Sequence, residues 1–182
     1  MSKGMETRQR FIDSTARLLR RNGYSGTGVL DVIADSGAPR GSLYFHFPGG
    51  KEELAIAAMD QANEQVVAWI ARTNLRQFFH QYARWIEKTE CLDGCPIAAL
   101  TAESSLSPRI RHAVSGALQS MENAFAAKLR GLGHPDERAQ ELAGMLVCVF
   151  EGAVIQCRAR ADAQPMRDAY DRLETMLAAT VA

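Results

Sequence analysis

The sequence predicts an all-α fold of about nine helices, and three observations lead to that prediction. Apolar residues recur at three- and four-residue spacing along most of the chain, which is the period of a helix with one buried face. No segment alternates apolar and polar residues for long enough to indicate a strand. Proline, glycine and small polar residues stand between the periodic segments, where they start and end helices.

The composition is that of a globular protein. The 182 residues are 47% hydrophobic and 23% charged, with 21 basic and 21 acidic side chains, which excludes a disordered chain. The longest apolar run, residues 142–150, is about half of the roughly 20 residues that span a bilayer, and the first six residues contain no apolar secretory signal. We therefore expect a cytoplasmic protein without a membrane span, whose four cysteines are thiols.

The N-terminal third is predicted to contain three helices. The first covers residues 6–22, where apolar side chains line one face. Thr27 is expected to cap a short second helix over residues 28–36. Pro39 suits the first turn of a third helix over residues 39–45, because the missing proline N–H costs nothing there.

The rest of the chain predicts six further helices. The sequence Phe47-Pro48-Gly49-Gly50 ends the third helix, and acidic residues directly after it favour the start of a long one. This break divides the chain into two predicted domains, residues 1–50 and residues 51–182. The six helices are expected over residues 51–73, 75–90, 97–104, 108–132, 136–160 and 164–179.

The second and third helices form a predicted helix-turn-helix. Two short helices joined by about three residues, one of them Gly37, are the arrangement in which the second helix enters the major groove of DNA. The distribution of charge agrees with this. Residues 1–51 contain eight basic and four acidic side chains, a net +4, whereas residues 52–182 contain 13 and 17, a net −4. The basic N-terminal part is the part that suits phosphate.

Residues 7–54 resemble the DNA-binding domain of the TetR family of repressors. The resemblance rests on four stretches of sequence: Thr7-Arg8-Gln9-Arg10-Phe11-Ile12, Asn22-Gly23-Tyr24, Gly41-Ser42-Leu43-Tyr44-Phe45-His46-Phe47 and Lys51-Glu52-Glu53-Leu54. It implies an N-terminal three-helix DNA-binding domain followed by a helical domain for ligand binding and dimerisation.

The resemblance also implies which residues contact DNA. Arg40 and its two successors would face base edges or nearby phosphates, and Tyr44 and His46 would contact the DNA backbone. Lys51 would bind a phosphate at a helix N-terminus. The expected DNA-binding residues are Thr27, Pro39, Arg40, Gly41, Ser42, Tyr44, His46 and Lys51. The same resemblance implies that three apolar side chains lie in the core: Leu43, Phe45 and Phe47.

Two stretches, residues 37–44 and residues 94–103, resemble the LmrA/YxaF-like branch of this family. Members of that branch repress multidrug-efflux or related genes and release DNA when they bind planar aromatic compounds. The resemblance therefore implies a ligand-responsive repressor that binds a palindromic operator as a dimer and is released by a small apolar or aromatic inducer. We expect no cofactor and no metal.

The C-terminal domain is rich in large apolar side chains, which allow two interpretations. Phe78, Tyr82, Trp85 and Ile86 follow helical spacing and form one inward stripe. Such a stripe packs the core of most helical proteins, but an aromatic-lined ligand pocket requires the same residue types. The candidate ligand-binding residues are Trp69, Phe78, Tyr82, Trp85, Ile86, Leu100, Met121, Phe125, Met145 and Phe150.

A dimer is expected because twofold pairing places two recognition helices about 34–36 Å apart on a palindromic site. The last two predicted helices contain apolar stripes and small residues that allow close helix contact. The core of a monomer would explain the same pattern. The candidate interface residues are Leu142, Val149, Ala153, Gln156, Tyr170, Leu173 and Leu177.

The cysteines leave one alternative function open. Cys91 and Cys95 bracket three loop residues and could approach within disulfide distance, so the alternative is a redox-responsive regulator that switches through this pair. The pair has no second cysteine pair nearby, and the histidines lack the spacing of a zinc site. The sequence contains no nucleophile elbow, phosphate loop or His-Glu-x-x-His motif, so we do not expect an enzyme.

Overall fold

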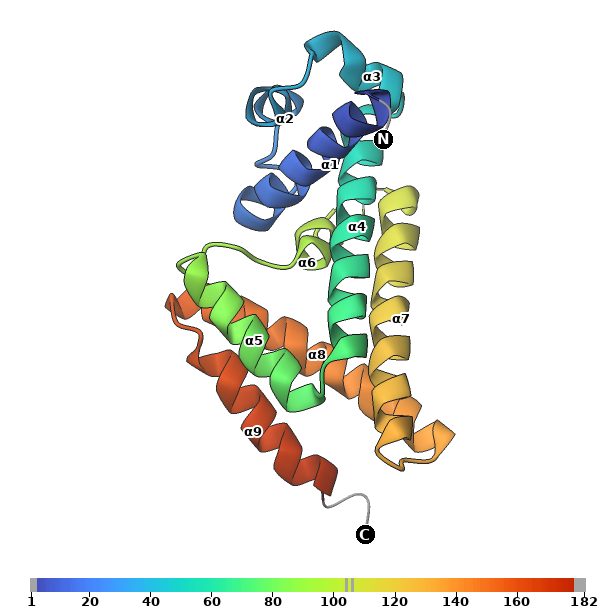
Figure 1. Ribbon diagram of the computed structural model, residues 1–182, viewed down its shortest axis with the longest axis vertical. Coiled ribbons are helices and arrows are strands. Elements are labelled where there is room, and N and C mark those ends of the chain that lie inside the picture. Colours follow the sequence, from blue (N-terminus) through green and yellow to red (C-terminus); the bar gives the residue numbers. More distant parts are fainter. Residues whose placement is uncertain (1–2, 104, 106, 179–182) are drawn as a thin grey trace. The chain divides into compact units, whose positions relative to one another are not determined.

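The computed structural model describes residues 3–103, 105 and 107–178, and over these residues the chain is all-helical (Figure 1). The predicted fold class is therefore confirmed. The described residues form nine α-helices and one 3-10 helix, η1: α1 (Lys3–Asn22), α2 (Val29–Ser36), η1 (Arg40–Ser42), α3 (Leu43–His46), α4 (Gly50–Arg72), α5 (Leu75–Lys88), α6 (Pro96–Thr101), α7 (Pro108–Gly131), α8 (Asp136–Arg160) and α9 (Gln164–Ala178).

The chain packs into two compact units. Unit 1 comprises Met1–Glu64 and Cys95–Ala117, and unit 2 comprises Gln65–Gly94 and Leu118–Ala182. The helices α4 and α7 therefore each begin in unit 1 and end in unit 2. Because α6 packs against α1, unit 1 contains more of the chain than the predicted domain of residues 1–50. The predicted functional division at residue 50 remains a prediction.

The core of unit 1 forms around α1, which contacts α2, α3 and α6. The Phe11 ring on α1 meets the Phe47 ring edge to face, with ring centroids 6.4 Å apart. Leu19 and Leu43 are fully buried beside them. A helix with apolar residues at this spacing can bury only one side, so the arginines of α1 remain on the other side or at its margin. This core holds the short helices of the helix-turn-helix in place.

Polar contacts attach α2 to α1 at its C-terminal end. The Asp35 carboxylate accepts hydrogen bonds from the Ser14 hydroxyl and the Arg17 guanidinium. The Ser14 hydrogen bond and then the Arg17 contacts hold the pKa of Asp35 below its usual value. The Arg10 guanidinium donates two hydrogen bonds, of 3.0 and 2.7 Å, to the Ser36 carbonyl. These bonds satisfy groups at the end of α2 that would otherwise lack partners.

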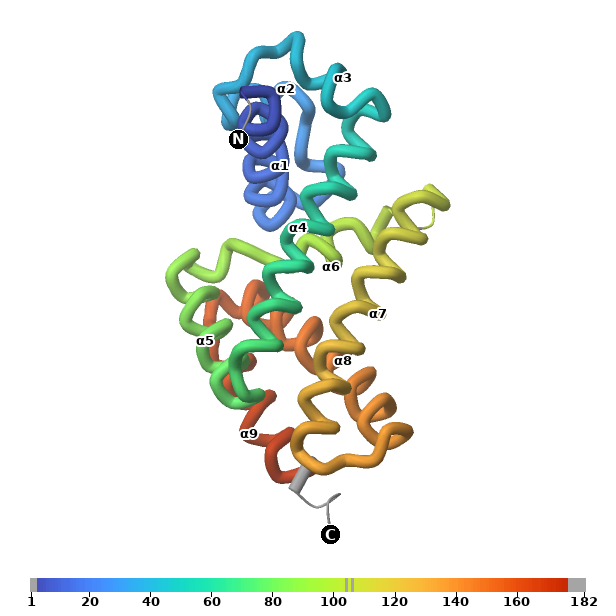
Figure 2. Tube along the Cα trace, turned by 45° about the vertical axis from the view of Figure 1, so that its right-hand side comes forward, coloured from blue at the N-terminus to red at the C-terminus, as the bar shows by residue number. Residues whose placement is uncertain are grey.

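Unit 2 is built around α8 and α9. The helix α9 packs against both α8 and α5, and Figures 1 and 2 show the three side by side. Two ion pairs connect α5 to α9: Arg76–Glu174 at 2.6 Å and Arg167–Glu87 at 2.5 Å. By length and composition alone α8 could cross a membrane, although the sequence was expected to contain no such helix. Nine of its side chains are buried within the protein, as in the core helix of a globular domain.

Most helix bounds lie within one to three residues of those predicted, and α8 matches its prediction. The exception is α3, which begins at Leu43 and not at Pro39, because η1 occupies Arg40–Ser42. The end of α5, expected at Glu90, has a clear physical cause. Glu90 and Cys91 both have left-handed backbone angles, with φ of 53° and 58°, so the helix ends at Lys88. Neither residue type signals such a turn, because glycine usually occupies left-handed positions after a helix.

Candidate nucleic-acid interface and C-terminal core

The segment of η1 and α3 presents one exposed face and one buried face. Leu43 and Phe47 are completely buried, whereas Arg40, Gly41 and Tyr44 are exposed, Tyr44 to 60%. Leu43 and Phe47 lie one helical turn apart and therefore point to the same side, into the core around α1. The predicted DNA-binding residues of this segment thus share the face that is open to solvent.

Phe45 was predicted to lie in the core, and this prediction is wrong. Its side chain is 81% exposed, the largest exposed fraction among the large hydrophobic residues that the structure describes. Each helical residue turns the chain by about 100°, so Phe45 points roughly 200° away from Leu43 and from Phe47. Its ring meets only the neighbouring His46 ring among the described aromatic pairs, with centroids 5.1 Å apart.

The capping role predicted for Thr27 is also wrong. Gly28 is the N-cap of α2, and the Asp31 carboxylate accepts a 3.0 Å hydrogen bond from its N–H. Thr27 is 2% exposed, and its hydroxyl donates a 2.7 Å hydrogen bond to the Gly23 carbonyl. Its N–H donates to the Tyr24 carbonyl at 3.1 Å. A phosphate accepts hydrogen bonds, so in this conformation Thr27 has no donor left for one.

The other polar residues of this segment differ in how freely they can reach a ligand. Pro39 is exposed and immediately precedes η1. The half-buried Ser42 uses its hydroxyl proton in a 2.7 Å hydrogen bond to the Pro39 carbonyl. His46 is half-buried at the end of α3. Arg40 and Tyr44 are therefore the polar side chains of the segment that extend farthest into solvent.

Lys51 lies in the first turn of α4, as the predicted phosphate contact requires. Its ammonium nitrogen is 4.3 Å from the centroid of the Tyr24 ring. Burial raises the pKa of Tyr24, and the nearby Glu52 and Glu103 carboxylates raise it further. Glu53 caps the same helix end, because its carboxylate accepts a 2.7 Å hydrogen bond from the Gly49 N–H. The helix end therefore already contains an acidic cap beside its lysine.

A polar network within unit 1 connects these N-terminal elements to α6 and α7. The Glu52 carboxylate accepts a 2.7 Å hydrogen bond from the Ser107 hydroxyl and forms a 3.2 Å ion pair with Arg109. The Ser25 hydroxyl donates a 2.6 Å hydrogen bond to the Glu103 carboxylate. These contacts were not predicted, because single serines and glutamates give no distinctive signal in a sequence.

The aromatic residues predicted to line a pocket pack against one another in unit 2. Phe78 contacts the rings of Trp69, Tyr82, Phe125 and Phe150, with centroids 5.3 to 6.0 Å apart. Most of these rings meet edge to face or at a tilt, the geometry that aromatic quadrupoles favour. The cluster, which we call the aromatic core, consists of Trp69, Phe78, Phe79, Tyr82, Trp85, Phe125, Phe150 and Tyr170.

The remaining candidates for ligand binding are not all beside this core in the fold. Ile86 and Met121 are completely buried in unit 2, and Met145 is half-buried there. Leu100, also completely buried, belongs to unit 1. Core packing accounts for the burial of these residues, and their contact with a ligand stays a prediction.

Asn63 is a buried polar residue that the sequence analysis missed. It is 8% exposed in α4, and its side-chain carbonyl has no hydrogen-bond partner among the described residues. A buried amide without partners is costly, so such groups commonly face water or a ligand. The signal was present in the sequence, since Asn63 interrupts an apolar stripe formed by Met59 and Ile70.

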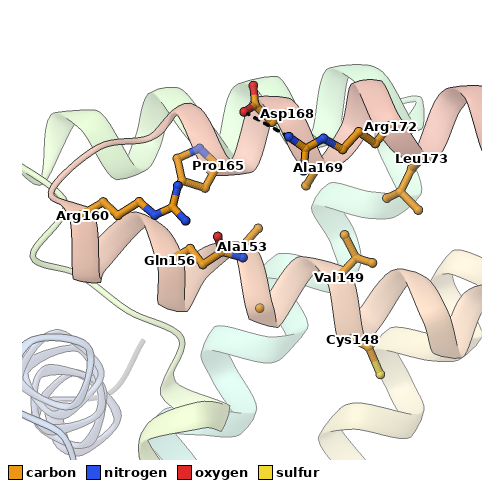
Figure 3. Close-up of a pocket in the computed structure, with 11 residues that line it drawn as sticks. Cys148, Val149, Ala153, Gln156, Arg160, Pro165, Asp168, Ala169, Arg172 and Leu173 are labelled. Carbon is orange, nitrogen blue, oxygen red and sulfur yellow. Dashed lines mark ion pairs between the residues drawn. The ribbon is translucent and has the colours of Figure 1, made fainter.

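A groove of about 470 Å³ lies between α8 and α9 within unit 2 (Figure 3). Small and apolar side chains form its floor, among them Val149, Gly152 and Ala153. Charged side chains border it, and an Asp168–Arg172 ion pair of 3.9 Å lies on α9. The lining thus includes four of the predicted interface residues: Val149, Ala153, Gln156 and Leu173.

Two other predicted interface residues are buried in the monomer. Leu142 is buried on α8, and Tyr170 packs its ring on Phe79 at 5.7 Å. Both therefore contribute to the core of unit 2. The side chain of Leu177 lies outside the described residues. Ala153 and Leu173 in the groove lining are buried as well, so Val149 and Gln156 are the lining candidates most open to a second copy.

The four cysteines are free thiols, and the two in the predicted redox pair, Cys91 and Cys95, are buried. Burial raises the pKa of Cys91, and the nearby Asp162 and Glu87 carboxylates raise it further. A higher pKa leaves less of the thiolate that oxidation requires. Redox switching through this pair stays a prediction. Among the described residues, no group of three or more His, Cys, Asp or Glu side chains could hold a metal ion.

Two family profiles match separate parts of the chain. Residues 11–58 match the profile of bacterial regulatory proteins of the tetR family. Residues 71–172 match the profile described as transcriptional regulator LmrA/YxaF-like, C-terminal domain. Together the two profiles cover the helix-turn-helix and every residue of the aromatic core except Trp69.

Similar proteins extend over nearly the whole chain. The HTH-type transcriptional regulator LmrA of Bacillus subtilis is 34% identical over 165 residues, which cover 85% of this chain and 87% of that protein. The uncharacterized HTH-type regulator YxaF of the same organism is 30% identical over 182 residues and covers 91% and 92%. A solved TetR regulator from Chloroflexus aurantiacus has a TM-score of 0.76 at 29% identity, and the match covers 98% of this chain and 97% of that one. A regulatory protein TetR from Rhodobacter sphaeroides, at 20% identity and a TM-score of 0.81, shares the fold over 90% of this chain and 95% of its own.

Proposed function

Because the chain belongs to the TetR family of bacterial transcriptional regulators, in the LmrA/YxaF-like branch, we propose that it is a ligand-responsive repressor. The relatives are transcriptional regulators and not enzymes. The proposed repressor binds a palindromic operator as a dimer and leaves it when a small apolar or aromatic effector binds the C-terminal domain. The observation that carries the proposal is the exposed face of η1 and α3.

The DNA-binding part of the proposal rests on that face. Arg40 and Tyr44 are exposed on a segment whose other face is anchored in the core by the buried Leu43 and Phe47. Arginine at the start of a recognition helix suits guanine edges, and a tyrosine hydroxyl suits a phosphate. Lys51 adds a positive charge at the N-terminus of α4, close to the same segment in sequence. The remaining predicted contacts, Pro39, Gly41, Ser42 and His46, complete the proposed interface.

The dimer part rests on the groove between α8 and α9. A twofold interface places the same surface of each subunit against its copy, so that surface must be self-complementary. The groove combines a floor of small residues with borders that contain both Arg160 and Asp168. Small residues allow two helices to approach closely, and opposite charges in one patch can pair across a twofold axis. We therefore propose α8 and α9 as the interface between two copies.

The effector part rests on the aromatic core. If a planar aromatic molecule entered this cluster, ring contacts within the protein would be replaced by similar edge-to-face contacts between the protein and the ligand. Trp69 and Tyr82 carry polar groups, and the Trp69 ring N–H is already engaged with the Gln81 amide at 2.7 Å. Such groups at the margin of an apolar site orient a ligand. The branch resemblance supports the same class of effector.

Coupling between the two functions is proposed to run through α4. This helix begins beside the recognition helix in sequence and ends at Arg72, three residues after Trp69 of the aromatic core. A ligand that binds best to one orientation of α4 would increase the population of dimers with that orientation. In those dimers the two recognition helices would no longer be about 34 Å apart, the spacing that successive major grooves require. Affinity for the operator would then fall.

A DNA-binding titration tests the proposal. A 30-base-pair duplex selected from a random pool by the full-length protein is titrated at two salt concentrations. We expect an affinity that falls steeply with salt, because basic side chains displace counterions from phosphates. Tyr44→Ala and Lys51→Ala should weaken binding to all sequences, whereas Arg40→Ala should also relax the selected sequence. Unchanged affinity of the Lys51→Ala variant would contradict that assignment, and failure to select any duplex would contradict the DNA-binding proposal.

A further inference from the structure

The exposed phenylalanine on the recognition segment has no role in the fold. Phe45 is 81% exposed, while Leu43 and Phe47 on either side of it are completely buried. Its ring contacts the His46 ring at the end of α3 but adds nothing to the core of unit 1. Single exposed apolar side chains are common on proteins, but Phe45 has the largest exposed fraction of those described and lies on the face that also presents Arg40 and Tyr44.

The position of Phe45 indicates what kind of partner it meets. Gly41 and Phe45 are four residues apart, so they lie on the same side of the helical segment, one turn from each other. Both are exposed, and a Cβ atom built on Gly41 would meet no other atom within 4 Å. The surface beside the Phe45 ring therefore contains a patch of bare backbone. A flat base edge can approach the protein closely there.

We infer that Phe45 reads the C5-methyl group of a thymine in the major groove of the operator, which makes it a specificity-determining residue. This inference rests on the proposed DNA-binding function. In the major groove only thymine among the four bases presents a methyl group, and apolar side chains distinguish it by contact. The charged and polar members of the same face, Arg40 and Tyr44, suit guanine edges and phosphate instead.

The experiment removes the methyl group and the ring separately. Each thymine of the selected 30-base-pair duplex is replaced in turn by uracil, which keeps the hydrogen-bonding edges and lacks only the methyl. The affinity of each duplex is measured for the full-length protein and for Phe45→Ala. We expect one symmetric pair of thymines at which uracil lowers the affinity of the wild-type protein about fourfold per half-site. This is the factor that corresponds to burying one methyl group. The same replacement should leave the affinity of Phe45→Ala unchanged.

Two controls separate this effect from damage to the fold. Phe45→Ala should melt at the same temperature as the wild type, because the ring is outside the core. Leu132→Ala removes another exposed large apolar side chain, in the turn after α7, and should leave every duplex affinity unchanged. Selection repeated with Phe45→Ala should no longer recover thymine at the sensitive position.

The failure of this inference differs from failure of the proposed function. If each uracil replacement lowers the affinity of the wild type and of Phe45→Ala by the same factor, Phe45 does not read a methyl group, although the protein binds DNA. If Phe45→Ala loses affinity for all duplexes while its uracil profile persists, the ring contacts the sugar–phosphate backbone and the inference is overturned. If the wild type selects no duplex, the regulator proposal itself fails.

Discussion

At the scale of single residues, Gly41 is a glycine that the protein itself does not require. Its φ is not positive, and a Cβ atom on it would meet nothing within 4 Å. By contrast, Gly37 has a φ of 58° and ends α2, so any other residue there would be strained. A glycine without a conformational or packing reason, on the exposed face of the recognition segment, points to a partner that approaches the backbone.

The Gly41→Ala variant tests this reading. Its free energy of unfolding should equal that of the wild type or exceed it by up to about 1 kcal/mol, because alanine restricts the unfolded chain. Its operator affinity should fall about tenfold, since the added methyl holds the DNA away. Urea unfolding and a DNA titration measure the two effects.

Gly116→Ala is the matched control for that variant, because Gly116 on α7 is also exposed and also has open space at its Cβ. This control should stabilise the protein and keep full DNA affinity. A Gly41→Ala variant that binds as tightly as the wild type would remove the argument for close approach of DNA.

Residue types near the recognition segment show what the sequence could and could not predict. The alternation of buried and exposed positions follows from helical geometry once Leu43 and Phe47 are known to face inward. The family resemblance implied a core position for Phe45, and phenylalanine is usually buried. Only the structure shows that its direction is opposite. Asn63 escaped notice for the reverse reason, since a polar residue on an apolar stripe is usually at the surface.

At the scale of secondary-structure elements, one carboxylate makes the contact between α1 and α2 sensitive to pH. Asp35 on α2 accepts hydrogen bonds from Ser14 and Arg17 on α1. These contacts hold the pKa of Asp35 in the folded protein below its value in the unfolded chain, near 3.8. The ionised carboxylate therefore stabilises the fold above about pH 4, and this contribution is lost as the pH falls through the folded pKa.

Asp35→Asn should consequently lower the free energy of unfolding by less than about 1 kcal/mol at pH 5 to 7, because exposed ion pairs contribute little. The difference from the wild type should shrink as the pH falls below about 4. Urea unfolding at pH 3, 5 and 7 measures it. Ser14→Ala, which removes the main cause of the lowered pKa, should show the same trend. A difference that is constant over this range would mean that the charge of Asp35 is not responsible.

Helix ends were predictable where their signals are local. Asn74 caps α5 and exchanges hydrogen bonds with Gln77, a pairing that depends only on their spacing. The left-handed pair Glu90 and Cys91 is the opposite case. Tertiary packing buries Cys91 and imposes a turn that neither side chain favours, so the sequence predicted a helix two residues too long.

At the scale of the whole molecule, the proposed dimer depends on the groove between α8 and α9. Gly152 lies in its floor, and a Cβ atom there would meet nothing within 4 Å of the same chain. A Gly152→Arg substitution should therefore fit the monomer while it blocks a second copy. We expect the variant to elute as a monomer of about 20 kDa at concentrations where the wild type is a dimer.

Gly144→Arg is the control for this prediction, because Gly144 lies on the same helix outside the groove lining. Its Cβ would approach only the Glu122 carboxylate at 3.9 Å, with which an arginine can pair. Size-exclusion chromatography with light scattering distinguishes the two variants. If Gly152→Arg remains a dimer, or if the wild type is monomeric, the interface lies elsewhere or does not form.

The two-part charge of the chain, +4 over residues 1–51 and −4 over residues 52–182, agrees with a molecule that meets phosphate at one part only. The family profiles divide the chain in a similar way, with the regulator profiles on residues 11–58 and 71–172. The sequence thus predicted two parts that the two profiles also separate, and the functions assigned to those parts stay predictions. The aromatic core, the groove and the network around Glu52 could be described only from the fold.

The central claim is that an aromatic effector and the operator compete for different states of one dimer. The most direct measurement is the fluorescence anisotropy of the labelled 30-base-pair selected duplex, titrated with full-length protein with and without a panel of planar aromatic, carbohydrate and metal-ion compounds. We predict saturation at two protein chains per duplex. We also predict that affinity for the duplex drops with one or more of the planar aromatic compounds and with no other class. Binding that no aromatic compound weakens, or release by carbohydrates or metal ions alone, would contradict the account.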